Sequence, residues 1–259
     1  MKSGYINSST YFEANLNSND VTNIFIHGVG LNHTMWKYQK DYFNKKSNVY
    51  YDLLNHGKTK KKYNVINFKD YNNQIIELIN YLNIKKFNLI GFSLGALIAQ
   101  HFASNYNDKI NKLIIIASVY NRSQEQKINV KNRYILSLNG DSIADDSIKR
   151  WFNSNYLNKN PLVYKYFFDI LKKNNQKYFL PAYKLFVESD KYKINFLNIK
   201  NPTLIITGEN DIGSTPEMSL KLSKKIINSK IYIVKKAKHM GIYEKAEKIN
   251  LEINNFINT

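Results

Sequence analysis

The clearest chemical signal in this sequence is Ser93, which stands between two glycines in the segment Gly91-Phe92-Ser93-Leu94-Gly95. An apolar run at residues 87–90 predicts a strand before it, and residues 96–103 predict a helix after it. A serine at so tight a strand-to-helix turn has a strained backbone, and the flanking glycines leave room for the turn. Its hydroxyl would project at a helix N-terminus, where the N–H of Leu94 can stabilise an oxyanion. The segment therefore predicts a nucleophilic serine.

A serine hydroxyl needs a histidine as general base, and an acid that orients the histidine. Both residue types follow predicted strands downstream: Asp211 lies beyond residues 203–206, and His239 lies beyond residues 230–234. Glu209 is an alternative acid, but a loop of this shape usually presents its later carboxylate, so we favour Asp211. The order nucleophile, acid, base along the chain is typical of one group of catalytic triads.

The segment His27-Gly28-Val29-Gly30 follows another predicted strand, residues 23–26. Glycine removes side chains that would block a backbone N–H from a substrate oxyanion, so we expect the amides of Val29 and Leu94 to form the oxyanion hole. The alternative is a glycine turn that merely ends a strand. We assign His27 to loop structure. The remaining histidines fall in a loop, a turn and a helix, and have ordinary structural interpretations: His33, His56 and His101.

Short apolar runs alternate with helical patterns, which predicts a mostly parallel, doubly wound α/β sheet with helices on both faces. The expected strands are residues 23–26, 48–51, 87–90, 112–116, 203–206 and 230–234, with an antiparallel edge hairpin at residues 5–13. The expected helices are residues 71–82, 94–105, 216–227 and 242–258.

The alternation stops after residue 116, and residues 124–190 carry aromatic-rich helical periodicity. We interpret residues 121–190 as a helical cap inserted into one core domain, formed by residues 1–120 and 191–259. Most of the aromatic residues would pack the cap, and its apolar underside would line a substrate pocket.

Composition narrows the class of protein further. The chain contains no cysteine, which excludes disulfides, thiolate catalysis and cysteine-ligated metal sites. It has no apolar run of about 18 to 20 residues, the length that spans a bilayer, and no apolar segment of signal-peptide length at its N-terminus. We therefore expect a cytoplasmic protein that is not bound to a membrane.

The net charge of +18 invites a nucleic-acid interpretation, but the residue types argue against it. Only three of the 38 basic residues are arginine, the residue that bidentate phosphate and base recognition favours. The lysines are spread along the chain, and their densest cluster, at residues 58–62, reads as a solvated loop. Since Lys, Asn, Ile and Tyr share AT-rich codons, we attribute the charge to genomic bias and predict no nucleic-acid partner.

Together these segments resemble the α/β-hydrolase superfamily. The resemblance runs over His27-Gly28, the stretch Asp52 to Thr59, the turn at Ser93, the turn from Gly208 to Asp211, and His239. Two further segments, Arg150-Trp151-Phe152 and Asp211 to Met218, resemble the 3-oxoadipate enol-lactonase group. The His27-Gly28 pair is instead shared with carboxylesterases and pimeloyl carrier-protein ester esterases. The resemblance implies acyl transfer from a small ester or lactone, without metal or organic cofactor.

All three arginines lie between positions 122 and 150, and an enol-lactone of this type carries a free carboxylate. We therefore expect Arg133 or Arg150 to pair with an acidic substrate group, while Trp151 forms a wall of the pocket. The alternative is surface arginines and a packing tryptophan. A carbon–carbon bond hydrolase and a cofactor-free perhydrolase would use the same triad, and a non-catalytic binding protein is the remaining alternative. The oligomeric state stays open.

Overall fold

The computed structural model describes residues 1–7, 9–17, 20–140 and 142–259. An eight-stranded sheet occupies the centre of this described part, in the order β1-β2-β4-β3-β5-β6-β7-β8. From β4 to β8 neighbouring strands are parallel, whereas β1 and β2 form an antiparallel hairpin that pairs with β4. The strands are β1 (Lys2–Ile6), β2 (Thr10–Asn15), β3 (Thr22–Ile26), β4 (Asn48–Tyr51), β5 (Phe87–Phe92), β6 (Ile110–Ile116), β7 (Thr203–Gly208) and β8 (Ser229–Val234).

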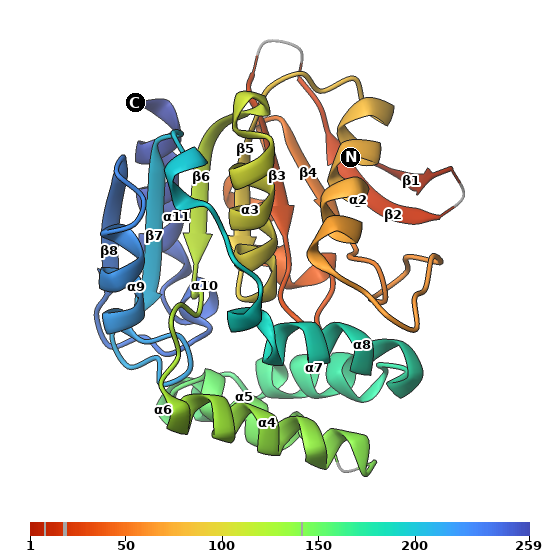
Figure 1. Cartoon of the computed structure of the whole chain (residues 1–259), viewed down its shortest axis with the longest axis vertical. Coiled ribbons are helices and arrows are strands. Elements are labelled where there is room, and N and C mark those ends of the chain that lie inside the picture. Colours follow the sequence, from red (N-terminus) through yellow and green to blue (C-terminus); the bar gives the residue numbers. More distant parts are fainter. Residues whose placement is uncertain (8, 18–19, 141) are drawn as a thin grey trace.

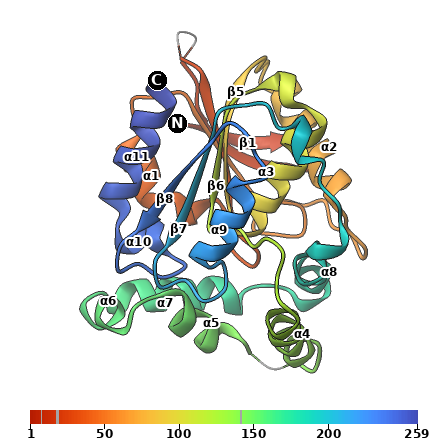
Figure 2. The same cartoon turned by 60° about the vertical axis from the view of Figure 1, so that its left-hand side comes forward.

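Helices cover both faces of the sheet, as the sequence predicts (Figures 1 and 2). One face carries α2 (Phe68–Tyr81), α3 (Leu94–Asn105) and α9 (Pro216–Ser223). The opposite face carries α1 (Lys37–Tyr42), α10 (Gly241–Glu244) and α11 (Ala246–Asn258). The doubly wound, mostly parallel α/β fold is therefore confirmed.

Successive side chains of each central strand enter two different hydrophobic cores. Leu89 packs with α2 and α3, whereas its neighbour Ile90 packs with residues of α11 on the other face. The same alternation holds for Ile115 and Ile114 in β6, because side chains along a strand point to opposite faces. Burial on both faces explains why these strands read as continuous apolar runs.

Among the described residues, five α-helices lie between β6 and β7 and extend across one end of the sheet, where α3 begins (Figures 1 and 2). We call them the cap. They are α4 (Gln124–Leu138), α5 (Ala144–Trp151), α6 (Ser154–Lys159), α7 (Pro161–Lys172) and α8 (Gln176–Val187). Polar contacts join the cap to the core, among them the hydroxyls of Tyr166 and Thr34 at 2.5 Å. Asn153 also donates its backbone N–H to the carboxylate of Glu244.

A ladder of three buried asparagines and one partly buried asparagine joins four strands at the opposite end of the sheet. The side-chain amide of Asn23 donates to Asn48, that of Asn88 donates to Asn23, and that of Asn111 donates to Asn88, at 2.9 to 3.0 Å. Each amide is both donor and acceptor, so the ladder satisfies polar groups that burial would otherwise leave unpaired. It fixes the order β4-β3-β5-β6 far from the cap.

The structure corrects several predicted boundaries. The helix expected at residues 216–227 ends at Ser223, since the chain must turn back toward β8, and Ile226 is buried in that turn. The helix expected at residues 242–258 is divided at Lys245, whose φ of −134° and ψ of 38° are not helical. Helix α1 was not predicted, because it has six residues of which only Gln39 is buried.

His101 on α3 makes the stability of the fold dependent on pH. It is 8% exposed and stacks on Phe68 at 3.8 Å, and burial lowers its pKa to about 4. The unfolded chain binds a proton near pH 6.5, so the stability that neutral His101 contributes is present above that pH. This stabilisation is lost as the pH falls toward 4, and the full loss in the free energy of unfolding is roughly 3 kcal/mol.

We expect His101→Phe to preserve the stacked ring and to remove this titration. The free energy of unfolding in urea should therefore fall less between pH 7 and pH 4.5 in the variant than in the wild type. Equal losses in both proteins over that range would contradict the assignment.

Candidate active site

Ser93 lies at the junction of β5 and α3 with a φ of 54° and a ψ of −112°. The turn is possible because its flanking residues have no side chain: a Cβ on Gly91 would lie 2.2 Å from the carbonyl oxygen of Gly95. A Cβ on Gly95 would lie 2.2 Å from the carbonyl oxygen of Ile26 in β3. The backbone N–H of Ser93 donates to the carbonyl of Ile116 in β6 at 2.9 Å. The left-handed conformation is therefore fixed by packing against both neighbouring strands.

Asp211 and His239 come together at the ends of β7 and β8. Nδ1 of His239 lies 2.7 Å from Oδ2 of Asp211, and the other carboxylate oxygen accepts the N–H groups of Gly213 and Ser214 at 2.9 Å. An ionised carboxylate can only accept, so Nδ1 carries the proton and Nε2 has a free lone pair. Asp211 is 4% exposed, which shields this pair from water.

Glu209, the alternative acid, lies in a different environment. Its carboxylate contacts the amine of Lys235 at 2.7 Å and the backbone N–H of Lys236 at 2.9 Å. Both carboxylate oxygens are engaged by lysine residues of the same loop. The structure thus brings Asp211, and not Glu209, against His239.

The loop after β3 forms a turn beside Ser93. The N–H of Leu31 donates to the carbonyl of Gly28 at 3.2 Å, and Gly30 has a φ of 73°, as the third residue of a type II turn requires. A Cβ on Gly28 would lie 3.3 Å from the Cβ of Ser93, so the backbone passes close to the serine. Val29 lines the same cavity as Ser93. We call residues 28–31 the oxyanion turn, after the role that the sequence analysis expects for Val29.

Leu94, the other expected donor, is the first residue of α3. The first N–H groups of a helix have no acceptor within it, so this amide is available at the helix N-terminus. Val29 and Leu94 therefore lie on the two segments that adjoin Ser93, as expected for a pair of oxyanion donors.

A cavity of about 160 Å³ lies between the cap and the ends of the strands. Ser93, Asp211, His239 and Val29 line it from the core. Trp151 lines it from the cap, with its ring centre 6.1 Å from that of His239. The other cap side chains that line it are both polar and apolar, and they include Gln126, Asn129, Ile143, Ser147, Leu171, Phe179, Tyr183 and Phe186.

All three arginines of the chain line this cavity. Arg122 is buried and forms an ion pair with Asp190 at 2.8 Å, and it also donates to Ser189 and to the carbonyl of Phe186. Within the described residues, neither Arg133 nor Arg150 forms an ion pair, and the buried Nε of Arg133 has no hydrogen-bond partner. Burial, and then the positive charge of Arg133, lower the pKa of Arg150 to about 10.

Several cavity residues were not singled out from the sequence. Tyr183 and Phe179 belong to an aromatic-rich stretch in which lining residues and packing residues share the same helical spacing. No residue type marks the side that faces the cavity. The ion pair of Arg122 with Asp190 could not be predicted from local sequence either, because the two residues are 68 positions apart.

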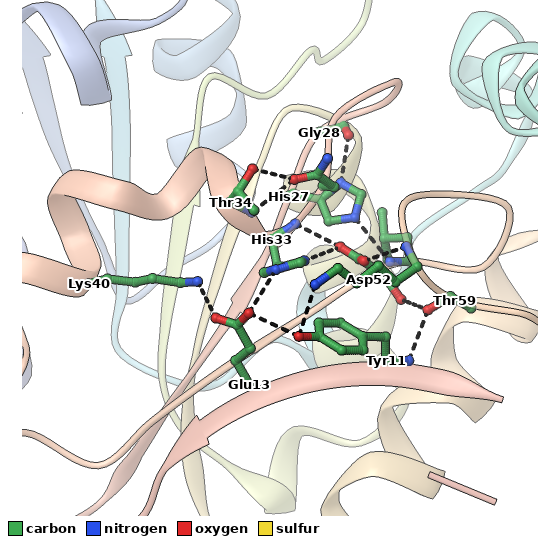
Figure 3. Close-up of polar contacts among 12 residues, drawn as sticks. Tyr11, Glu13, His27, Gly28, His33, Thr34, Lys40, Asp52 and Thr59 are labelled. Atoms are coloured by element: carbon green, nitrogen blue, oxygen red, sulfur yellow. Dashed lines mark hydrogen bonds and ion pairs between the residues drawn. The ribbon is translucent and has the colours of Figure 1, made fainter. Parts of the chain in front are cut away.

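A buried polar network lies behind the oxyanion turn (Figure 3). Asp52, at the end of β4, accepts both the N–H and the Nδ1 of His33 at 2.7 Å, and Nε2 of His33 lies 3.0 Å from Glu13. Burial favours the neutral form of Asp52, but its contacts with His33 prevail and lower its pKa. His27 and His56 lie nearby, and burial lowers their pKa values to about 4 and 3, so both rings are neutral near pH 7.

Two further observations on the described residues concern metal ions and membranes. They contain no group of three or more His, Asp or Glu placed to hold a metal ion. None of their helices is both long enough and apolar enough to cross a bilayer.

Comparison with known proteins gives the chain a family. Residues 24–246 match the model of the alpha/beta hydrolase fold. The chain belongs to the α/β-hydrolase family. The enol-lactonase from Burkholderia xenovorans LB400 has the same fold, with a TM-score of 0.83 at 18% identity over the whole of both chains. Membership of this family supports hydrolase activity, and a small-molecule substrate is what fits a hydrolase of this family.

Two curated relatives cover most of this α/β-hydrolase. One is (E)-2-((N-methylformamido)methylene)succinate hydrolase from Acinetobacter baylyi, 26% identical over 91% of this chain and 90% of its own length. Another is pimeloyl-[acyl-carrier protein] methyl ester esterase from Wigglesworthia glossinidia brevipalpis, 31% identical over 88% of this chain and 90% of its own. The expected resemblance to enol-lactonases and esterases is thus confirmed.

The two candidate acids can be distinguished by activity. We expect Asp211→Asn to lower kcat for p-nitrophenyl acetate about 10³- to 10⁴-fold, because an amide no longer fixes the tautomer of His239. Glu209→Gln, the matched control, should stay within about twofold, because surface ion pairs contribute little. A larger loss in Glu209→Gln than in Asp211→Asn would contradict this choice of acid.

Proposed function

We propose that this α/β-hydrolase cleaves a carboxylic ester or lactone through an acyl-enzyme on Ser93. One observation carries the proposal: Ser93, at a strained strand-to-helix turn, lines the same cavity as His239, and Asp211 holds that histidine at 2.7 Å. The proposed nucleophile, base and acid thus lie beyond the ends of three different strands and meet at one cavity, which is consistent with acyl transfer by a triad.

The proposed mechanism has two halves. Nε2 of His239 accepts the proton of the Ser93 hydroxyl while Oγ attacks the carbonyl carbon, and the N–H groups of Val29 and Leu94 stabilise the resulting oxyanion. The protonated histidine then donates to the leaving oxygen, and the acyl group remains on Ser93. A water molecule attacks this ester with His239 again as base, which releases the acid and restores the serine.

We propose further that the substrate carries a carboxylate, as in 3-oxoadipate enol-lactone. Arg133 and Arg150 bring two positive charges to one cavity, and no described carboxylate pairs with either. A guanidinium group is well suited to bind a carboxylate through two parallel hydrogen bonds. The relative from Acinetobacter baylyi is named for a substituted succinate, whose chemistry is consistent with this proposal.

A carbon–carbon bond hydrolase and a perhydrolase remain alternative activities, because the same three residues can serve both. A binding protein without catalysis is less consistent with the site, since all three triad positions are occupied by competent residues. Activity on defined substrates distinguishes these possibilities.

We expect the wild type to hydrolyse p-nitrophenyl acetate, p-nitrophenyl butyrate or 3-oxoadipate enol-lactone. Ser93→Ala should lower kcat by about 10⁴-fold or more, since removal of a triad nucleophile leaves only the oxyanion hole and binding. Release of p-nitrophenol and the loss of enol-lactone absorbance measure the two reactions. Equal rates for both proteins on every substrate would refute the serine hydrolase proposal.

The carboxylate preference can be tested with two esters of similar size. We expect Arg133→Met and Arg150→Met each to raise KM for mono-p-nitrophenyl succinate about tenfold or more, as loss of a charge-assisted hydrogen bond implies. KM for uncharged p-nitrophenyl butyrate should change less than about threefold. Lys149→Met is the matched control, because Lys149 lies beside Arg150 on α5 but its side chain is 67% exposed. Equal changes for both esters would exclude recognition of the carboxylate.

A further inference from the structure

The N–H of Val29 is held in its direction by the carbonyl on the other side of the same peptide bond. Gly28 C=O and Val29 N–H belong to one planar peptide unit, and the described residues contain no cis peptide bond. In a trans peptide these two groups point in opposite directions. Whatever fixes the carbonyl of Gly28 therefore also fixes the direction of the Val29 N–H.

His27 is the side chain that contacts this carbonyl. Its Nδ1 lies 2.8 Å from the oxygen of Gly28, and the N–H of Leu31 donates to the same oxygen. The other ring nitrogen, Nε2, accepts the backbone N–H of Leu53 at 3.0 Å. A backbone N–H can only donate, so Nε2 has no proton and Nδ1 must carry it. Nδ1 of the ring therefore donates to the carbonyl of Gly28. Figure 3 shows His27 beside Gly28, with dashed lines from both ring nitrogens.

We propose that His27 is a positioning residue of the oxyanion hole, because it holds the Gly28–Val29 peptide so that the Val29 N–H faces the carbonyl attacked by Ser93. This proposal rests on the proposed function, which assigns the oxyanion to Val29 and Leu94. It gives His27 a role in addition to the loop structure that the sequence analysis assigns to it.

Two other side chains brace the same turn. His56 accepts the N–H of Gly30 on its Nε2 at 3.0 Å, while its Nδ1 lies 2.9 Å from the carbonyl of Leu54. From the cap, the side-chain amide of Asn174 donates to the carbonyl of Gly30 at 2.8 Å. These contacts hold the N–H and the carbonyl of Gly30, and they leave the carbonyl of Gly28 to His27 and to the N–H of Leu31.

Packing restricts the ring of His27 to this position. It is fully buried, and its centre lies 5.2 Å from that of His56 in an edge-to-face arrangement. Burial also keeps it neutral near pH 7, since its pKa falls to about 4. A protonated ring would lose the hydrogen bond from Leu53, because Nε2 would become a donor.

Two substitutions separate the donor from the acceptor. In His27→Asn the side-chain amide can occupy the position of Nδ1 and donate to Gly28, whereas in His27→Gln the side-chain oxygen can reach the position of Nε2 and accept from Leu53. We expect His27→Asn to retain kcat within about fivefold. His27→Gln should lower kcat for p-nitrophenyl acetate about 10²-fold with KM within about twofold, as loss of one oxyanion donor does.

A tetrahedral adduct provides a second measurement. Phenylboronic acid bound to the serine places an oxygen in the oxyanion hole, so its affinity should fall in His27→Gln by nearly the same factor as kcat/KM. Thermal unfolding of both variants reports the purely structural cost. If the two variants lose kcat equally, or if His27→Gln keeps it, the proposal is overturned.

A measurement on the wild type does not depend on the variants folding. The ¹⁵N chemical shifts of His27 at pH 7 should show a protonated Nδ1 and a bare Nε2, and the Val29 amide proton should shift when phenylboronic acid binds. The opposite tautomer, or an unmoved Val29 amide in the adduct, would overturn the proposal. Absence of esterase activity in the wild type, or full activity in Ser93→Ala, would instead count against the proposed function.

Discussion

The left-handed backbone of Ser93 is the constraint on which the rest of the site depends. A non-glycine residue in this region costs about 1 to 3 kcal/mol, so the surrounding packing must impose it. Here β3 and β6 do so from either side: the carbonyl of Ile26 blocks any side chain at Gly95, and the carbonyl of Ile116 accepts the N–H of Ser93. Ser93 is thus positioned by the middle of the sheet, the most deeply buried part of the fold.

The same packing determines where every other group of the site must come from. Since β3 lies directly beside β5, the loop after β3 passes Ser93 and can present the Val29 amide. The ends of β7 and β8 lie beyond β6, which places Asp211 and His239 on the other side of the serine. Strand order therefore converts residues far apart in sequence into one site, and the cap encloses it. The buried histidines behind the oxyanion turn fix the finer geometry that strand order leaves free.

What the sequence predicts well are features that one strand and its following loop contain. Ser93, Asp211 and His239 each come within five residues of the end of an apolar run, so position along the chain implies position at one edge of the sheet. His27 shows the limit of this reasoning, because its contacts with Leu53 and Gly28 depend on the side-by-side placement of β3 and β4. Helix α1 and the cavity-facing side of the cap could not be predicted for a related reason. A short segment, or one with aromatic residues on several faces, has no hydrophobic periodicity that shows which side is buried.

The positive charges that act on the site are those that line the cavity, and not the more numerous charges on the surface. Exposed lysines such as Lys149 are solvated and screened, so they set the net charge of +18 without acting on the cavity. Arg133 and Arg150 line the cavity together, and burial, followed by the positive charge of Arg133, lowers the pKa of Arg150. An empty cavity is thus destabilised by like charges that an anionic substrate would neutralise. A neutral ester gains nothing from this repulsion, and the same two arginines that weaken the cap without substrate would favour an acidic one.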